Sequence, residues 1–448
     1  MSTIAICIWP MPSSLLSAVG LAKRLRRRGH RVCIISTPDV ESSARAEDIE
    51  FVPVLAGLFP AGSWVAQTRF YTTLSRIGLL HEIRRTVRHY RAIIDGLLAS
   101  EQNEIDQAFE RIAPDLVLIY ADFPVPAVAG LMALRRGIRC AYVTSIFYHY
   151  RGPASPPLSS GLVPRPEGWS RLLVRLAWAR FHLARRVRAR LGIALGLDLD
   201  LLHILRTLSR QAGGAGWPLE WDCFLAPMLR LPEFFLTPRE LDFPIEPRDG
   251  SHWLGRGDDD RVEEPFPWER VDSSRQLVYC ALGTQLFLPL DRQRAFLQAV
   301  IDALAARPHL QLALATGAYV MQTDLVVRAP DAIVLERMPQ LQVLRRARLM
   351  ITHSGTNSVL ECAHRGVPMI TFPLGFDQFG NAARVVYHRL GLRGDIRRAT
   401  ADEIGRLIDA VVEDEAMRRR CAAMSALSRD QDRYEAGMRT LEALAKRP

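Results

Sequence analysis

The chain is short of the residues that mark several classes of protein. Its 448 residues include seven cysteines, an odd number that stand singly, which argues against a disulfide framework or a zinc knuckle. The apolar segments around Cys7 and Cys33 instead predict buried thiols in a reducing compartment. No run reaches the roughly 18 uncharged apolar residues of a membrane-spanning helix, so the sequence argues against an integral membrane protein.

Lysine is almost absent, because the 58 basic residues include only Lys23 and Lys446. This scarcity argues against a Walker phosphate loop, a Schiff-base lysine and a kinase-type lysine. The net charge of +10 and the pI near 9.6 are interpreted as a general surface property, with some attraction for anionic ligands or lipid headgroups and no nucleic-acid partner. No basic residue precedes the first apolar run, which predicts a first strand rather than a signal peptide and a cytoplasmic protein.

Ordinary fractions of hydrophobic (48%) and charged (24%) residues exclude wholesale disorder and favour a globular protein of two or three domains. The first residues alternate as strand (4–9), helix (14–30) and strand (31–36), which is a βαβ start typical of a parallel sheet. Further strands are predicted at 114–122 and 139–146. Long amphipathic helices are expected between residues 66 and 112.

The segment 249–276 is acidic, polar and rich in Pro and Gly, and we interpret it as a linker between domains. A second strand and helix alternation follows it. The sequence therefore predicts an N-terminal domain at 1–248 and a C-terminal domain at 277–448, whose last helix could pack back on the first. The fold class is α/β, with no short-period repeat.

Residues 338–382 carry the most informative pattern in the chain. A strand ends at His353, a tight turn through Gly355 follows, and a helix is expected to start near Asn357. Because a helix N-terminus presents free N–H groups and a positive dipole end, the turn is suited to a phosphate or diphosphate. Thr356, Asn357 and Ser358 can add side-chain donors, and Glu361 can accept from ribose hydroxyls.

This segment resembles the nucleotide-sugar signature of the UDP-glycosyltransferases, glycosyltransferase family 1, and among bacterial members it is most similar to the zeaxanthin and macrolide types. The matching positions are Gln340, His353, Gly355, Asn357, Ser358, Glu361, Gly366, Pro368, Asp377 and Gln378. The resemblance implies the GT-B fold, in which two Rossmann-like domains face each other across a cleft. It also implies an inverting, metal-independent transfer of a hexose from a UDP-sugar, or less favourably a dTDP-sugar, to a small hydrophobic natural-product or lipid-like acceptor, without a cofactor.

The resemblance assigns roles on the donor side. It places Met338 and Gln340 at the uracil, and Glu361 at the ribose. The diphosphate would be held by His353, Ser354, Gly355, Thr356, Asn357 and Ser358, with Gly283 and Thr284 beside it. Asp377 and Gln378 would hold the sugar hydroxyls. One departure is that the tryptophan that begins this segment in plant members is missing, and Arg337 and Met338 stand there instead.

On the acceptor side the sequence departs further from the family. Counting back from His30, the position of the family's catalytic histidine falls on Ser14, and a serine hydroxyl is a poor base without a partner. The companion acid has a match in Asp122, which could act as the base directly, act through Ser14, or merely cap the following helix. An acidic acceptor that needs little help, or His149 as a substitute base, are the remaining explanations.

Two other features carry open alternatives. Phe123, Phe147, Tyr148 and His149 would suit a flat or apolar acceptor pocket, or they belong to the core. The basic helix predicted at 171–190 alternates Leu, Trp and Phe with Arg, so it is either a solvated face or a contact with anionic lipid at a membrane surface.

Two other functions would use a similar fold. The first is a sugar-nucleotide epimerase, which would need further acids and histidines that the sequence does not place. The second is a catalytically silent protein that binds a nucleotide sugar and partners an active transferase.

Overall fold

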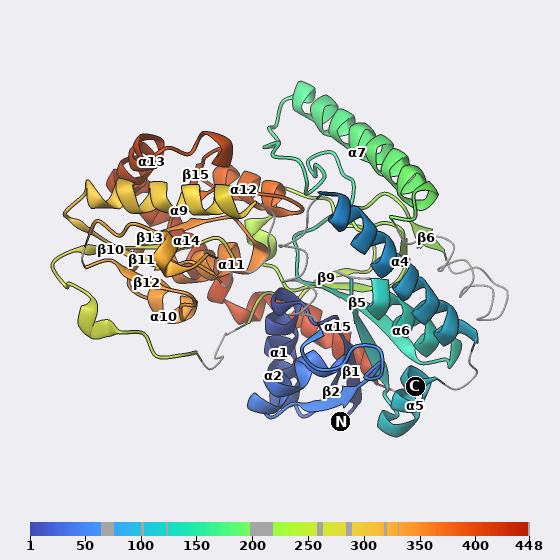
Figure 1. Ribbon diagram of the computed structural model, residues 1–448. Coiled ribbons are helices and arrows are strands. Elements are labelled where there is room, and N and C mark those ends of the chain that lie inside the picture. Colours follow the sequence, from blue (N-terminus) through green and yellow to red (C-terminus); the bar gives the residue numbers. More distant parts are fainter. Residues whose placement is uncertain are drawn as a thin grey trace.

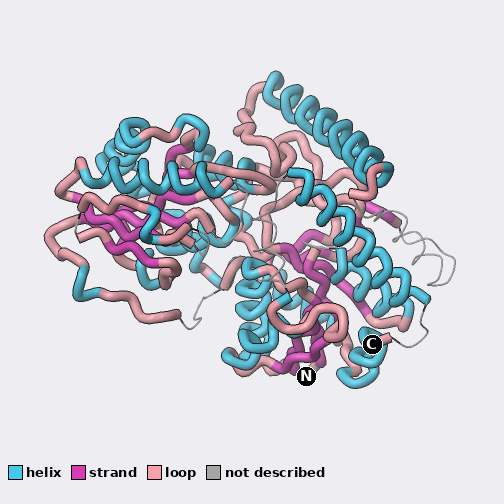
Figure 2. The backbone as a smooth tube through the Cα atoms, in the orientation of Figure 1, coloured by secondary structure: helices cyan, strands magenta, loops and turns pink. Residues whose placement is uncertain are grey.

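The protein is described from a computed structural model, which covers residues 1–63, 76–99, 103–121, 124–197, 218–257, 263–283, 289–317, 320–329 and 331–446. Its described elements gather around two separate parallel sheets, with helices on the outside of each (Figures 1 and 2). Three catalytic- or binding-site predictions, those for Asp122, Phe123 and Thr284, lie outside the described residues.

The first sheet has seven strands in the order β3-β2-β1-β4-β5-β8-β9, and all the paired strands are parallel. These strands are β1 (Thr3–Cys7), β2 (Arg31–Ser36), β3 (Glu50–Pro53), β4 (Leu116–Tyr120), β5 (Arg139–Thr144), β8 (Glu233–Phe235) and β9 (Ser251–Trp253). A small antiparallel pair, β6 (Leu219–Glu220) and β7 (Met228–Leu229), lies outside this sheet. The βαβ start predicted from the sequence is therefore confirmed.

Helices connect these strands, and several of them pack on the first sheet. They are α1 (Pro12–Arg27), α2 (Glu41–Ala46), α4 (Arg76–Ala99), α5 (Glu104–Ile112), α6 (Pro124–Arg135) and α7 (Gly168–Ala194), with short 3₁₀ turns at Pro38–Val40 and Arg239–Leu241. The buried face of α1 packs on the apolar side chains of the central strands. Such burial on both faces explains why the strands read as continuous apolar runs.

The second sheet has six strands in the order β12-β11-β10-β13-β14-β15, and again all pairs are parallel. Its strands are β10 (Gln276–Ala281), β11 (Leu310–Ala315), β12 (Ile333–Leu335), β13 (Ala347–Thr352), β14 (Met369–Thr371) and β15 (Gly391–Arg393). Its helices are α9 (Leu290–Ala305), α10 (Gln340–Leu344), α11 (Thr356–Arg365), α12 (Gln378–Tyr387), α13 (Ala401–Glu413), α14 (Glu415–Arg429) and α15 (Glu435–Ala445), with 3₁₀ turns at Trp268–Arg270, Gln322–Asp324, Ile396–Arg398 and Gln431–Tyr434.

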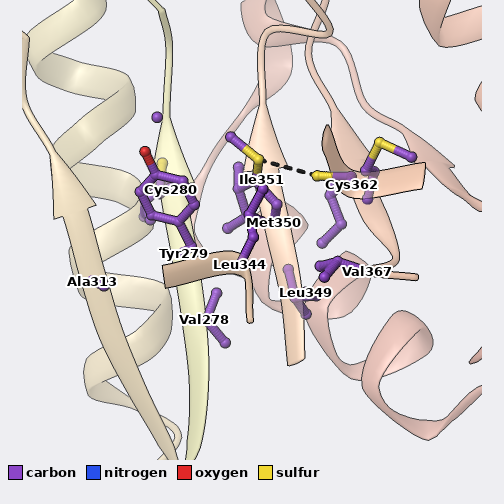
Figure 3. Packing of buried hydrophobic residues seen from close by; sticks show 14 of the residues in the cluster. Val278, Tyr279, Cys280, Ala313, Leu344, Leu349, Met350, Ile351, Cys362 and Val367 are labelled. Carbon is purple, nitrogen blue, oxygen red and sulfur yellow. Dashed lines mark hydrogen bonds between the residues drawn. The ribbon is translucent and has the colours of Figure 1, made fainter. Parts of the chain in front are cut away.

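We call the second sheet with its helices the second half of the molecule, and the first sheet with its helices the first half. The core of the second half is a layer of aliphatic, aromatic and sulfur-containing side chains between β10, β13 and the helices (Figure 3). Leu349 and Ile351 of β13 are fully buried there, and the Sγ atom of Cys362 lies 3.3 Å from the Sδ atom of Met350. All seven cysteines of the chain are buried and unpaired, as the sequence predicted. Because burial raises the pKa of the Cys362 thiol well above its ordinary value, it packs as a small hydrophobe.

The two halves meet through a buried ion pair. Arg384 of α12 donates from Nε (2.9 Å) and Nη2 (2.6 Å) to Oδ1 of Asp242, and both side chains are fully buried. The guanidinium also lies 4.8 Å from the ring centre of Phe147 and 4.4 Å from that of Phe243. An ion pair of this kind fixes the register of the two halves, because displacing either partner would leave a buried charge without compensation.

The chain passes between the halves twice. Strand β9 lies inside the range predicted as a linker, so the first sheet extends to Trp253 and the connection follows it. The last helix, α15, returns to the first half, where Met438 and Leu441 are buried in its core. Arg28 ties the two together, since its guanidinium donates to the carboxylates of Glu435 and Glu442.

Candidate active site

The N-terminus of α11 is the centre of the candidate site. Strand β13 ends at Thr352, Ser354 takes a left-handed conformation (φ +60°), and Gly355 is the N-cap, with no side chain capping the helix. The N–H groups of the first turn therefore point outward from a sharp turn, with the positive end of the helix dipole behind them. This is the strand-turn-helix arrangement that the sequence predicted.

The ring of His353 lies against Gly283 and Gly355, and it would clash with a side chain at either position. A Cβ on Gly283 would lie 2.4 Å from Cε1 of His353, and one on Gly355 would lie 2.5 Å from Nε2. Burial lowers the pKa of His353 to about 4, and a hydrogen bond with the Ala281 carbonyl opposes that effect only in part. The imidazole is therefore neutral near pH 7, so it can donate one N–H but adds no positive charge.

The loop before α12 carries the second part of the site. Oδ2 of Asp377 accepts from the Thr356 hydroxyl (2.6 Å) and from Nδ2 of Asn381 (2.7 Å). The same Asn381 nitrogen lies 3.0 Å from the Ser354 carbonyl, so it joins the two turns. Burial raises the pKa of Asp377, although these hydrogen bonds oppose the shift. Sequence reasoning missed Asn381, although its position one helical turn after Asp377 could have indicated it.

Gln378 fixes the shape of this loop. Its Oε1 accepts from the backbone N–H groups of Leu374 (2.7 Å) and Gly375 (3.1 Å). Its carbonyl accepts from the hydroxyl of Ser354 at 2.9 Å. The structure thus brings Asp377 and Gln378 beside the α11 turn, as the family resemblance implies.

Glu361 lies one turn into α11 and is held from two sides. Nη2 of Arg256 donates to Oε1 at 2.8 Å, and Nε2 of Gln340 donates to Oε2 at 2.6 Å. Arg256 also donates to the Asn357 carbonyl at 3.2 Å. Gln340 reaches Ser358 as well, since its Nε2 lies 3.4 Å from the Ser358 hydroxyl oxygen. Met338, next to this group, is half-buried against the core.

Arg256 was not identified from the sequence. It belongs to a Gly-Arg-Gly segment that follows β9, and its side chain crosses from the first half to α11. No local pattern indicates this contact, because it depends on how the two halves pack. Its guanidinium binds the carboxylate of Glu361, the group that the resemblance assigns to ribose binding.

The first half meets the α11 turn at the start of α1. Nδ2 of Asn357 donates to the carbonyl of Ser13 at 3.2 Å. Ser14 is next along the chain and is 1% exposed, in the first turn of α1. The structure therefore brings the Ser14 region and the proposed diphosphate turn together.

Phe147, Tyr148 and His149 are packing residues in this structure rather than pocket-lining ones. All three are at most 1% exposed, because the segment after β5 runs into the junction of the two halves. Nε2 of His149 lies 2.9 Å from Oε1 of Glu233, which also accepts from the Thr144 hydroxyl, while Oε2 of Glu233 accepts from the Tyr150 hydroxyl. The core interpretation of these aromatic residues is therefore the one that the geometry supports.

Two features of the described residues bear on the class of chemistry. Within the described ranges, no group of three or more His, Cys, Asp or Glu side chains could hold a metal ion. None of the helices in those ranges is long and apolar enough to cross a membrane.

Comparison with known proteins agrees with this site. Residues 267–434 match the family model described as UDP-glucoronosyl and UDP-glucosyl transferase. The zeaxanthin glucosyltransferase of Pseudescherichia vulneris is 27% identical over 430 residues, which cover 94% of this chain and 93% of that protein.

Solved structures share the whole architecture. The glycosyltransferase of kitacinnamycin superposes with a TM-score of 0.70 at 20% identity, covering 99% of both chains. A spinosyn rhamnosyltransferase complexed with thymidine diphosphate superposes with a TM-score of 0.63 at 16% identity, covering 99% of this chain and 100% of the other.

These findings define the protein as a glycosyltransferase with the GT-B fold. The segment that matches the model of UDP-glucoronosyl and UDP-glucosyl transferases, residues 267–434, contains the α11 turn, the α12 loop and Glu361. The predicted fold is confirmed, and the matched segment includes residues 338–382, on which the family resemblance rests.

Proposed function

We propose that the protein transfers a hexose from a UDP-sugar to a small hydrophobic acceptor, with inversion at the anomeric carbon and without a metal ion. The observation that carries this proposal is the uncapped N-terminus of α11, which faces the start of α1 across the junction of the two halves. An anionic diphosphate fits the α11 end, and an acceptor approaching from the first half would then face the anomeric carbon.

The donor side supplies a fixed set of hydrogen-bonding groups. The first-turn N–H groups of α11 would donate to the diphosphate, and so would the single N–H of the neutral His353 imidazole once it leaves the Ala281 carbonyl. Asp377 and Gln378 would face the sugar. Glu361 would accept from the ribose hydroxyls, which requires its carboxylate to be shared with, or released by, Arg256.

Leaving-group stabilisation can come from the protein itself. Negative charge grows on the departing diphosphate in the transition state, and oriented N–H groups at a helix end stabilise it without reorganising. His353 adds a donor rather than a charge because its imidazole is neutral. The electrostatic work of a metal ion is thus assigned to the α11 turn.

The acceptor hydroxyl must lose a proton as its oxygen attacks the anomeric carbon and the bond to the diphosphate breaks. A single displacement of this kind inverts the configuration at that carbon. We assign the base role to Asp122, either directly or through Ser14, with an acidic acceptor as the variant of the mechanism that needs no base.

Two considerations support the substrate classes. The matched family is described by UDP-sugar transfer, whereas one structural neighbour holds thymidine diphosphate, so UDP is the first donor to test and dTDP the second. A full-length relative is named for zeaxanthin, which supports a hydrophobic acceptor.

The test is a turnover assay that separates transfer from binding. The purified protein is incubated with UDP-glucose or dTDP-glucose and a panel of hydrophobic alcohols and phenols, and mass spectrometry identifies any product heavier by one hexose. Product together with released UDP supports the enzyme. Tight UDP binding without product on any acceptor contradicts it and supports the silent-partner alternative, which the serine at position 14 motivates.

A further inference from the structure

Helix α7 exposes an unusual amount of apolar surface. Only Ser170, Val174 and Trp178 of its residues are buried, and these lie one turn apart on a single face. Six large apolar side chains recur at three-, four- and seven-residue steps on the opposite face and are 47–65% exposed. These are Trp169, Leu172, Leu176, Leu183, Val187 and Leu191, which we call the outer row. Figure 1 shows α7 at the periphery of the first half.

The charge on α7 has one sign. The helix holds seven arginines and no Asp or Glu. Arg180 interrupts the outer row, while Arg175 and Arg186 flank it. Long arginine side chains can lay their stems along apolar surface and keep the guanidinium in a polar layer. An apolar row edged by cations is the pattern of a helix that lies in the interface of an anionic membrane.

The arginines of α7 also argue against a second copy of the chain as the partner that covers the outer row. Two α7 helices packed through their outer rows would bring arginines against arginines, with no acid on either helix to compensate. Helix α4 extends the basic surface, since Arg84 donates from Nε to the Leu195 carbonyl just beyond the end of α7 at 2.8 Å, and Arg88 and Arg91 on the same helix are exposed.

We infer that α7 docks the protein on an anionic lipid surface. The outer row inserts at the boundary between the headgroups and the acyl chains, and the arginines contact the headgroup phosphates. The attachment is peripheral and reversible, because it combines a single apolar row with electrostatic attraction.

An aromatic series connects this helix to the donor loop. Trp178 contacts Phe181 (5.5 Å between ring centres), Phe181 stacks on Phe224 (5.5 Å), and Phe224 meets Phe376 edge to face (4.9 Å). Phe376 is 49% exposed and directly precedes Asp377. Trp178 is buried beneath this series, but Phe181, Phe224 and Phe376 are partly exposed. A hydrophobic acceptor leaving the lipid beside α7 would therefore meet these three rings on its way to the sugar-binding loop, a step that rests on the proposed function.

Sedimentation with vesicles tests the docking without any substrate. We expect the wild-type protein to bind vesicles of phosphatidylglycerol and phosphatidylcholine at least about tenfold better than vesicles of phosphatidylcholine alone. Raising the salt concentration should reduce that preference, because it screens the headgroup charge. Equal binding to both vesicles, or binding to neither, overturns the inference.

Variants separate the outer row from general charge. Leu176→Glu with Leu183→Glu should lower binding to the anionic vesicles roughly tenfold or more, because it puts acids into the inserted row. Met321→Glu with Val326→Glu is the matched control, since these residues are 64% and 61% exposed in the second half and the double change should leave binding unchanged. Equal losses in both variants contradict docking through α7, and so does a wild-type dimer that the double variant converts to monomer.

A second readout uses the transfer reaction. The double variant should lose activity on an acceptor carried in anionic vesicles and keep it on the same acceptor dispersed in detergent. If no acceptor is glycosylated under either condition, the proposed function fails while the vesicle result still decides the docking. If activity in vesicles is unchanged in the double variant, delivery through α7 is contradicted.

Discussion

The two helix N-termini that meet at the candidate site, those of α11 and α1, are built differently. Both lack a capping side chain, and they touch through the hydrogen bond from Asn357 to the Ser13 carbonyl. Helix α11 is entered through Ser354 and Gly355, so its first-turn N–H groups are free for an anion. Helix α1 is entered through Met11 and Pro12, and proline has no N–H to offer.

From this difference we assign stabilisation of the leaving diphosphate to the second half and removal of the acceptor proton to the first half. The second half holds preorganised donors for a leaving diphosphate, together with a neutral histidine and a tightly bonded acidic loop. The first half contributes a serine where the family's base would stand. The groups that we assign to charge stabilisation lie within the described residues, whereas proton removal is assigned to Asp122 from the sequence alone.

The largest effect is expected on the acceptor side. Asp122→Asn should lower the rate about 10²–10⁴-fold if Asp122 is the base, which is the usual contribution of general base catalysis. The affinity for UDP should hardly change, because the donor contacts belong to the second half. Steady-state kinetics on one acceptor and UDP titration measure the two effects separately.

Ser14→Ala and Ser13→Ala complete this experiment. A loss in Ser14→Ala comparable to that in Asp122→Asn indicates a relay, and a loss in Asp122→Asn alone indicates a lone carboxylate. Ser13→Ala is the control, since it keeps the carbonyl that accepts from Asn357. If neither Asp122→Asn nor Ser14→Ala loses activity, the base assignment is wrong and an acidic acceptor takes its place.

A smaller effect is expected from the donor half. His353→Ala should reduce kcat about 10²–10³-fold, because one preorganised hydrogen-bond donor is lost where charge grows. Binding of UDP should weaken much less. His309→Ala, an exposed histidine of the same half, is the matched control. Full activity in His353→Ala would show that the diphosphate is not held at this turn.

Glu361 provides the next test. Glu361→Ala should weaken donor binding by about 1–3 kcal/mol, because it strands the hydrogen-bonding groups of Gln340 and the ribose. Isothermal titration with UDP measures the loss, with the exposed Glu413→Ala as control.

A double-mutant cycle with Arg256→Gln then asks whether the ion pair competes with the ribose. A coupling free energy near zero would show that Arg256 and Glu361 act independently on UDP binding, which contradicts competition between Arg256 and the ribose for this carboxylate.

The low pKa of His353 should make the free energy of unfolding depend on pH. Its pKa is about 4 in the folded protein and 6.5 in its ordinary state, so between these pH values only the unfolded chain binds the proton. The free energy of unfolding should therefore fall as the pH drops from 6.5 towards 4. Urea denaturation at pH 7 and pH 5 should show a smaller drop for His353→Gln than for the wild type. An equal drop in both proteins would contradict the buried, neutral histidine.

The sequence predicted the α11 turn because its signals are local: a β-rich run, a histidine, a glycine and a helix start within ten residues. The contacts that cross between the halves could not be predicted in this way. Arg256 reaches Glu361, and Arg384 reaches Asp242, only once both sheets are packed. The sequence allowed Phe147, Tyr148 and His149, which follow β5, to line a pocket or to belong to the core. Their side chains are buried at the junction of the two halves, so they belong to the core.

The smallest effect is expected from removing metal ions. EDTA should leave the rate unchanged within error, because the charge on the leaving diphosphate is assigned to the N–H groups of α11 and to His353 rather than to a cation. The assay compares initial rates with and without EDTA, and after adding Mg²⁺ or Mn²⁺ back. A loss that either ion restores would contradict this assignment. It would show that the free N–H groups at the entry of α11 are insufficient, and that the two helix ends meet around a cation as well as a substrate.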